Sequence, residues 1–204
     1  MPSTDGSSLR ILRYVLWALA AVAIMAVGWF QVISPRLQSL SESGTDNLGR
    51  GDYQLVATDG STFTQDSLKG QPTAVFFGFT HCPDVCPTTL GEVAGWQEDL
   101  SKEGKSLRVY FVTVDPERDT VEALREYVSW VPGVMGVSGE PEEIAKAVKA
   151  FRVYARKVPT EGGYTMDHSA MTLLFDDKGR YSGLIGYQED PERTKASLEK
   201  LVAG

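Results

Sequence analysis

The chain has 204 residues, of which 42% are hydrophobic and 23% charged, so it is long enough for one domain with extensions and has the balance of a globular protein. Its formal net charge of -7 argues against nucleic acid as the main partner, because phosphate binding needs a basic face. Residues 1–50 hold four arginines against three acidic residues, a net charge of +1, which leaves -8 for the remainder.

The first predicted element is an uncharged apolar stretch at residues 14–33. At about 1.5 Å per residue, a helix of this length spans a hydrocarbon core of about 30 Å. Trp17 and Trp29 lie near its two ends, where amphipathic rings favour the membrane interface. A cleaved signal peptide usually has a shorter apolar region with a small-residue cleavage site, and a core helix this apolar needs a larger protein around it. The stretch therefore predicts a single transmembrane anchor.

The charges beside this stretch predict its orientation. Arg10 and Arg13 precede it, whereas the sequence after Arg36 turns polar and then acidic, so the positive-inside bias places residues 1–13 in the cytoplasm and the rest outside. The N-terminus lacks the Arg-rich amphipathic pattern of a mitochondrial transit peptide, which favours a bacterial inner membrane with the soluble domain in the periplasm. Residues 34–50 are rich in Ser and Gly and predict a flexible tether.

Strands and helices alternate along residues 51–204, which we interpret as one domain. The segment 53–64 predicts a hairpin that turns at its Asp-Gly pair. The continuous apolar runs 73–80 and 107–115 predict strands that are buried on both faces. The predicted helices are 83–102, 120–131, 141–156 and 191–203, and the strands of a closing hairpin are 170–175 and 181–187 around a turn at 176–179.

The order of these elements predicts the fold class. Strand–helix–strand–helix followed by a hairpin and a helix is typical of a layered α/β domain. It is also the order of the thioredoxin fold. We therefore expect an α/β, thioredoxin-like domain with an added N-terminal β-hairpin, preceded by a single transmembrane helix.

The two cysteines of the chain, Cys82 and Cys86, follow a predicted buried strand at the point where a helix begins. If the first turn is helical, the i, i+4 spacing places both sulfurs on one face, with Cβ atoms about 5–6 Å apart. Pro83 suits a first turn, whereas Pro87 predicts a distorted one. A helix N-terminus lowers the pKa of a thiol, and an extracytoplasmic compartment permits a disulfide.

Four interpretations of the cysteine pair are open: a structural disulfide, two inert buried thiols, a dithiol redox catalyst, and a metal site that uses both thiolates. A structural disulfide would close only a small loop and gain little chain entropy. A metal site needs a further ligand, and the chain has two histidines, His81 and His168. His81 adjoins Cys82, and neighbouring side chains on an extended segment point in opposite directions, so we expect it to pack beside the site.

His168 precedes the closing hairpin, and in a thioredoxin-like sheet the loop at this place faces the start of the first helix after the cysteines. Two thiolates and one imidazole form a soft ligand set that suits copper, above all Cu(I), and that can also hold Cu(II) or zinc. A structural zinc site normally has a fourth ligand, and no further cysteine is present. Asp167 is expected to orient the imidazole or to cap the loop, and Asp84 to supply a charge to the first helical turn.

Three motifs occur in an order that resembles the Sco/SenC family of membrane-anchored copper proteins: FGFTHCPDVCPTTL, VTVDPERDT and YTMDHS. The resemblance covers roughly residues 46–204. It implies a thioredoxin-like fold that holds one copper ion, Cu(I) or Cu(II), through Cys82, Cys86 and His168. It also implies a client, because family members help to load the CuA centre of cytochrome c oxidase subunit II by copper delivery, by thiol reduction, or by both.

Other functions on the same fold stay open at this point. A membrane-tethered thiol–disulfide reductase would use the redox pair Cys82 and Cys86, and a redox or copper sensor would share the site. A thiol peroxidase is disfavoured because Val75 and Phe79 occupy the places of its usual proline and threonine. Other copper carriers or thiol reductants are expected as further partners. The segment VDPERDT predicts a strand end and a helix cap at Asp119 or Thr120, on a surface that partners contact.

Overall fold

The computed structural model describes residues 6–28 and 47–203. The chain divides into two compact units, residues 1–45 and 46–204. The first contains helix α1, Gly6–Gly28, which overlaps the predicted anchor at 14–33; the rest of that anchor, and the predicted tether up to residue 46, lie outside the described residues. In the part of the chain that the structure describes, no helix has both the length and the apolar character needed to span a membrane.

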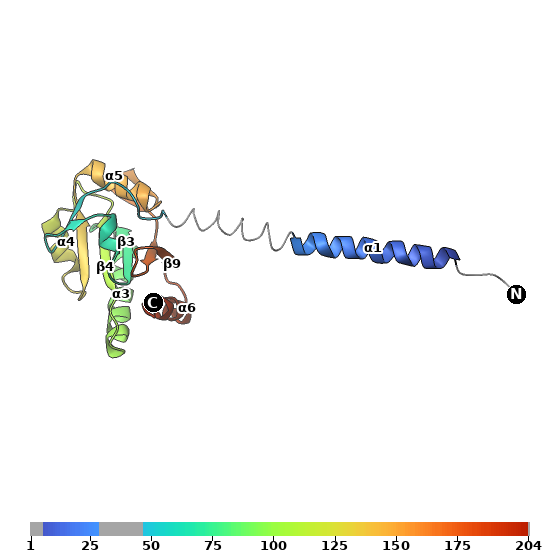
Figure 1. Ribbon diagram of the computed structural model, residues 1–204. Helices are drawn as coiled ribbons and strands as arrows, with labels where there is room; N and C mark the ends of the chain where they lie inside the picture. The colour runs from blue at the N-terminus through green and yellow to red at the C-terminus, as the bar shows by residue number, and fades with distance from the viewer. Residues whose placement is uncertain (1–5, 29–46, 204) are drawn as a thin grey trace. The chain divides into compact units, whose positions relative to one another are not determined.

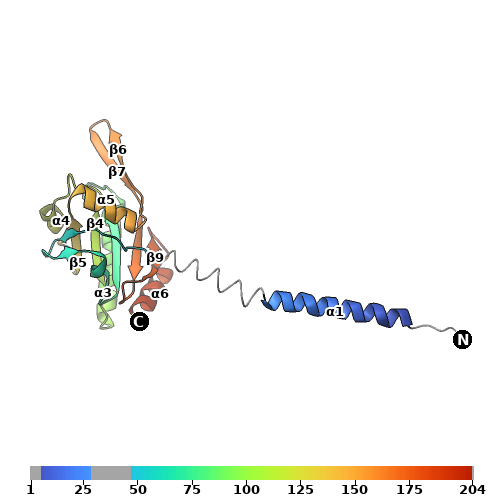
Figure 2. The same ribbon diagram turned by 45° about the horizontal axis from the view of Figure 1, so that its top comes forward.

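The second unit is an α/β domain built on a seven-stranded sheet with the order β2-β1-β5-β4-β3-β8-β9 and a separate two-stranded hairpin, β6-β7 (Figures 1 and 2). The strands are β1 Leu55–Ala57, β2 Thr62–Phe63, β3 Thr73–Gly78, β4 Arg108–Thr113, β5 Val134–Ser138, β6 Ala155–Thr160, β7 Gly163–His168, β8 Met171–Phe175 and β9 Tyr181–Gly186. The helices are α3 Val85–Lys102, α4 Val121–Val128, α5 Pro141–Ala150 and α6 Pro191–Val202, with a short 3-10 helix η2 at Gln65–Leu68.

Strand β3 is an interior strand of the sheet, between β4 and β8, and is buried along its whole length. It pairs in parallel with β4 and antiparallel with β8, as expected for a continuous apolar run with no solvent-facing side. On one face Phe77 packs against Phe151, 5.1 Å between ring centroids, just after α5. On the other face Gly78 lies against Cys86 in α3. Figure 1 shows α5 on one side of the sheet and α3 and α6 on the other.

The α/β class and the added N-terminal hairpin are confirmed. Strands β1 and β2 pair antiparallel around the predicted Asp59-Gly60 turn. Gly60 has a φ of +88°, which a glycine adopts at low cost, and the Asp59 carboxylate accepts a hydrogen bond of 2.9 Å from the backbone of Ser61. The closing hairpin β8-β9 and the final helix α6 also form where the sequence predicts them.

The prediction that one helix covers residues 141–156 is wrong. Helix α5 ends at Ala150, where the buried ring of Phe151 packs into the core and Arg152 turns the backbone with a φ of +52°. Residues 155–160 then form β6, which pairs with β7 in a hairpin that projects from the domain (Figure 2). Strand β5 was also not predicted; it pairs in parallel with β4 and antiparallel with β1.

The domain includes residues that the sequence assigned to the tether. Residues 47–50 form a turn in which Leu48 and Gly49 are buried. The Tyr53 hydroxyl donates a hydrogen bond of 2.7 Å to the Gly49 carbonyl, and the Gly49 amide donates one of 3.0 Å to the Ala150 carbonyl at the end of α5. The packed domain therefore starts before the predicted boundary at residue 51.

Candidate metal centre

Among the residues that the structure describes, one group of three can hold a metal ion: Cys82, Cys86 and His168. Their ligand atoms all lie within 4.8 Å of one another. The Cys86 Sγ atom is 3.6 Å from His168 Nε2, and the Cys86 backbone N–H donates to Cys82 Sγ at 3.4 Å. Cys86 is buried, whereas Cys82 and His168 are half-buried, and both cysteines are free thiols.

The cysteines are held where β3 gives way to α3. Cys82 lies in the loop between them, and Cys86 lies in the first turn of the helix. The prediction that Pro83 belongs to this turn is wrong, because α3 begins at Val85. Pro87 is the third helical residue, where a missing backbone N–H leaves no intrahelical hydrogen bond unmade, so this turn tolerates it.

A glycine lets the second sulfur approach the sheet. A Cβ atom at Gly78 would lie 2.7 Å from Cys86 Sγ and 2.9 Å from Phe111 Cε2, closer than real Cβ atoms come to such neighbours. The absence of a side chain at the last residue of β3 therefore leaves the space that the Cys86 sulfur occupies.

His168 is the last residue of β7, at the base of the projecting hairpin. Its Nδ1 atom is 3.0 Å from the Ser169 carbonyl oxygen. A carbonyl can only accept, so Nδ1 carries the proton and the lone pair of Nε2 faces the sulfurs. The Phe79 ring meets the imidazole at 89° with 5.7 Å between centroids, and Phe76 lies at 6.3 Å. This tautomer and this packing present the nitrogen in the form that binds a metal.

The other predicted neighbours of the site lie apart from the ligand atoms. His81 is exposed, with Nδ1 2.9 Å from the hydroxyl of Thr80. The carboxylate of Asp167 is exposed and pairs with Arg156 at 3.8 Å, so the Ser169 carbonyl fixes the imidazole instead. Asp84 is the N-cap residue of α3, one position before the first turn in which its charge was predicted, and its side chain makes no capping hydrogen bond.

Burial decides the protonation of the site. It raises the pKa of the Cys86 thiol, which is the opposite direction to the lowering predicted for a thiol at a helix N-terminus. Burial also lowers the pKa of His168, although its contact with the Ser169 carbonyl and the charge of Asp167 act in the opposite direction. At neutral pH the site thus holds a neutral imidazole and a protonated Cys86 thiol, and a metal ion bound there would displace the thiol proton.

The loop that carries Cys82 is fixed by a buried carboxylate. Asp119 Oδ2 accepts hydrogen bonds from the Thr80 backbone N–H at 3.0 Å and from the Thr113 hydroxyl at 2.7 Å. Its Oδ1 accepts a third from the Thr80 hydroxyl at 2.6 Å. Three donors compensate the desolvation of this carboxylate, and they hold the backbone two residues before Cys82.

A second buried carboxylate holds the strand that carries the histidine. Asp115 accepts hydrogen bonds from Arg118 Nε and from the Tyr164 hydroxyl, the latter at 2.8 Å. The Arg118 guanidinium lies 3.9 Å from the centre of the Tyr164 ring, and its Nη1 donates to the Tyr164 carbonyl at 3.2 Å. Tyr164 belongs to β7, so this network fixes the strand that ends at His168.

The sequence did not predict these supports. The sequence of residues 114–120 predicts a strand end, a helix cap and a partner surface. Of the two predicted caps Thr120 is the one that caps α4, accepting a hydrogen bond from the Ala123 N–H at 3.1 Å. The available signal was position: Asp115 and Asp119 follow a buried strand at the same sheet edge as the cysteines.

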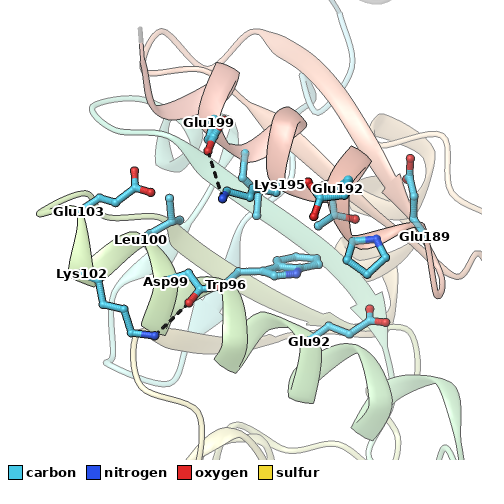
Figure 3. Close-up of a pocket in the computed structure, with 13 residues that line it drawn as sticks. Glu92, Trp96, Asp99, Leu100, Lys102, Glu103, Glu189, Glu192, Lys195 and Glu199 are labelled. Carbon is cyan, nitrogen blue, oxygen red and sulfur yellow. Dashed lines mark hydrogen bonds and ion pairs between the residues drawn. The ribbon is translucent and has the colours of Figure 1, made fainter.

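A cavity of about 500 Å³ among the described residues is not part of this centre. It lies between α3 and α6, with the Trp96 ring inside it and carboxylates such as Glu92, Glu189 and Glu192 around it (Figure 3). None of the three metal-binding candidates lines it. The candidate centre is instead a small cluster where strand, loop and helix meet.

Comparison of the sequence with known proteins identifies relatives of this chain. A family model described as SCO1/SenC matches residues 41–203. A SCO2-like protein of Rickettsia conorii is 37% identical over 135 residues, which cover 64% of this chain and 66% of that protein. The mitochondrial SCO1 homolog 1 of Arabidopsis thaliana is 38% identical over 156 residues, 74% of this chain and 46% of that one. The chain thus spans less than two thirds of the length of these two relatives.

Two solved structures extend the comparison to the fold. Bradyrhizobium japonicum ScoI with copper bound is 44% identical, has a TM-score of 0.68, and is matched over 76% of this chain and 99% of its own. Yeast Sco1 with copper bound is 32% identical, with a TM-score of 0.70 over 78% of this chain and 90% of its own. Their likeness to this domain confirms the thioredoxin-like α/β fold.

Proposed function

This chain belongs to the SCO1/SenC family, and we propose that it is a copper metallochaperone that binds one copper ion through Cys82, Cys86 and His168. The observation that carries the proposal is the convergence of two sulfurs and one imidazole nitrogen within 4.8 Å. This soft ligand set suits Cu(I). Copper-bound structures of the Bradyrhizobium and yeast relatives support the choice of metal.

In the proposed function copper is the cargo that the protein carries to its client. The chemistry of the three proposed ligands explains how the copper is taken up. The two thiols give up their protons as the sulfurs take Cu(I), while His168 binds in its neutral form and releases none. Transfer proceeds by exchange of one ligand at a time with thiols of the client. Cys82 and His168 are half-buried, so client thiols can replace these two ligands first. Cys86 is buried, so its bond to copper is the last to be exchanged. The proposed client is the CuA centre of cytochrome c oxidase subunit II.

The same sulfurs support a second candidate function, thiol reduction. Cys82 and Cys86 are both free and adjacent in space. Their oxidation to a disulfide releases two protons and two electrons, which reduce a client disulfide to two thiols. Disulfide formation would also remove both thiolate ligands, so the oxidised protein would not hold copper. Delivery and reduction therefore share one site and exclude each other in a single turnover.

We also propose that residues 14–33 anchor the chain in the inner membrane, with its N-terminus in the cytoplasm and its domain in the periplasm. The uncharged stretch and the preceding arginines support this placement. Protease added to intact spheroplasts tests it, because the domain should be cleaved while residues 1–13 stay protected. A domain that is cleaved only after lysis would contradict the orientation.

A copper titration of the reduced full-length chain tests the function. We expect one equivalent of tightly bound Cu(I) in the unchanged protein and a large loss of affinity in His168→Ala. His81→Ala is the matched control, because His81 is exposed and lies outside the ligand group, and it should bind copper as the unchanged protein does. Equal affinities of His168→Ala and His81→Ala would remove His168 from the site.

A further inference from the structure

A second pocket, remote in sequence from the metal centre, lies where the domain begins. Its volume is about 420 Å³. Four of its eight lining residues are cationic and one is acidic, although the chain as a whole has a net charge of -7. The lining residues are Asn47, Arg50, Gly51, Asp52, Lys146, Lys149, Ala150 and Arg152.

Most of this positive charge is not neutralised within the domain. Lys146 pairs with Glu143 at 2.5 Å. Arg50, Lys149 and Arg152 are exposed, and none of the three side chains has an ion pair or hydrogen bond with another described residue. These three positive charges and the one negative charge of Asp52 give the pocket a net charge of about +2.

The helix that borders the pocket does not account for all of its cations. Lys149 is in the last turn of α5, where the helix dipole favours a positive charge. Arg50 belongs to a distant part of the sequence, before β1, and Arg152 lies two residues after the end of α5, so only Lys149 and Lys146 are part of the helix itself. Arg152 has a φ of +52°, a backbone conformation that glycine usually adopts at a helix end, yet an arginine occupies it beside the pocket.

We propose that this pocket binds a phosphate-bearing anion, supplied either as free phosphate or as the headgroup of an anionic lipid. Two guanidinium groups and an ammonium around one cavity are the groups that bind phosphate oxygens, with arginine able to donate two parallel hydrogen bonds. The chain length makes a lipid source feasible. The pocket begins at Asn47, and the 13 residues of 34–46 reach at most about 45 Å from the end of the proposed anchor.

The lipid source rests on the proposed anchor, whereas binding of the anion itself does not. Residues 46–204 are a compact unit with its own core, and the ScoI structure, 99% of which is matched by 76% of this chain, shows that a domain of this size folds without an anchor. This unit can therefore be tested in solution. Inorganic phosphate is titrated while the amide resonances of Arg50, Lys149 and Arg152 are followed, and flotation is measured with phosphatidylcholine vesicles with and without phosphatidylglycerol.

The decisive variant is Arg50→Gln/Lys149→Gln/Arg152→Gln, and its matched control is Lys178→Gln/Lys195→Gln/Lys200→Gln, which removes the same charge elsewhere. The pocket variant should lose about a hundredfold in affinity for phosphatidylglycerol vesicles, since each basic residue near an anionic surface contributes roughly fivefold. The control should lose much less, and both should still bind one copper, which separates this proposal from the metal site.

Each outcome bears on the proposal. Vesicle binding that depends on both phosphatidylglycerol and the pocket residues supports a lipid headgroup. Phosphate-dependent shifts at the pocket, with no preference for charged vesicles, support a free anion. Equal losses in the pocket and control variants would overturn the proposal, as would the absence of both phosphate shifts and vesicle binding.

Discussion

Gly78→Ala tests the steric basis of the metal centre. The added Cβ atom would meet Cys86 Sγ at 2.7 Å and the Phe111 ring at 2.9 and 3.0 Å. A carbon normally keeps about 3.5–4.0 Å from such an atom, so the sulfur or the ring must move by roughly 1 Å. Gly78 is at the end of a strand, and its φ does not lie in the left-handed region, so the backbone itself tolerates alanine.

The expected cost combines this overpacking with the displacement of the ligand. Insertion of one carbon into a packed core usually costs about 1–3 kcal/mol. We therefore expect the free energy of unfolding of the reduced, metal-free protein to fall by about 2 kcal/mol. We also expect copper affinity to fall at least tenfold, because Cys86 Sγ leaves its place 3.6 Å from His168 Nε2.

Denaturant unfolding of the metal-free protein and competition for Cu(I) with a chelator measure the two effects. Gly91→Ala is the control, because Gly91 lies in the same helix as Cys86 with open space where its Cβ atom would be. Alanine there should stabilise α3 by up to about 1 kcal/mol and leave copper binding unchanged. If Gly78→Ala matches Gly91→Ala in both assays, the close approach of Cys86 to the strand has no energetic role.

Three further changes test the supports and the electrostatics. Asp119→Ala removes the acceptor of three hydrogen bonds. It should lower the free energy of unfolding by about 2–4 kcal/mol and weaken copper binding. An unchanged unfolding curve would refute the supporting role of Asp119. Tyr164→Phe removes a hydrogen-bond donor to Asp115 and should lower the free energy of unfolding by about 1 kcal/mol. If β7 positions His168, the Cu(II)–thiolate absorption band of this variant should be broadened; an unaltered band would show that it does not. Burial lowers the pKa of His168, so the unfolded state binds a proton on this imidazole more readily than the folded state does. The free energy of unfolding of the metal-free protein should therefore fall as the pH drops below 6.5, the ordinary pKa of histidine. His168→Asn should remove that part of the pH dependence.

The sequence predicted the candidate site more completely than the elements around it. Cys82, Cys86 and His168 belong to local motifs whose order singled them out as candidate ligands, and the structure brings their side-chain donor atoms together. Strand β5 escaped prediction because its apolar run is short and is broken by Gly136, which faces Leu124 of α4. Its strand character depends on pairing with distant β1 and β4.

The hairpin β6-β7 was not predicted from the sequence, for a different reason. It projects from the domain, so its residues are exposed or half-buried and show no alternation of polar and apolar side chains. Asp115 and Asp119 are the corresponding case for the site. Both belong to a charged segment that is typical of a surface turn, and only the tertiary fold buries them against Tyr164 and Thr80.

X-ray absorption at the copper edge of the reduced, Cu(I)-loaded full-length chain tests the central claim most directly, because it counts the atoms bound to the metal. The account predicts two sulfur ligands and one imidazole nitrogen per copper, with the nitrogen lost in His168→Ala and retained in His81→Ala. A spectrum with sulfur ligands alone in the unchanged protein, or one that His168→Ala leaves unaltered, would contradict it.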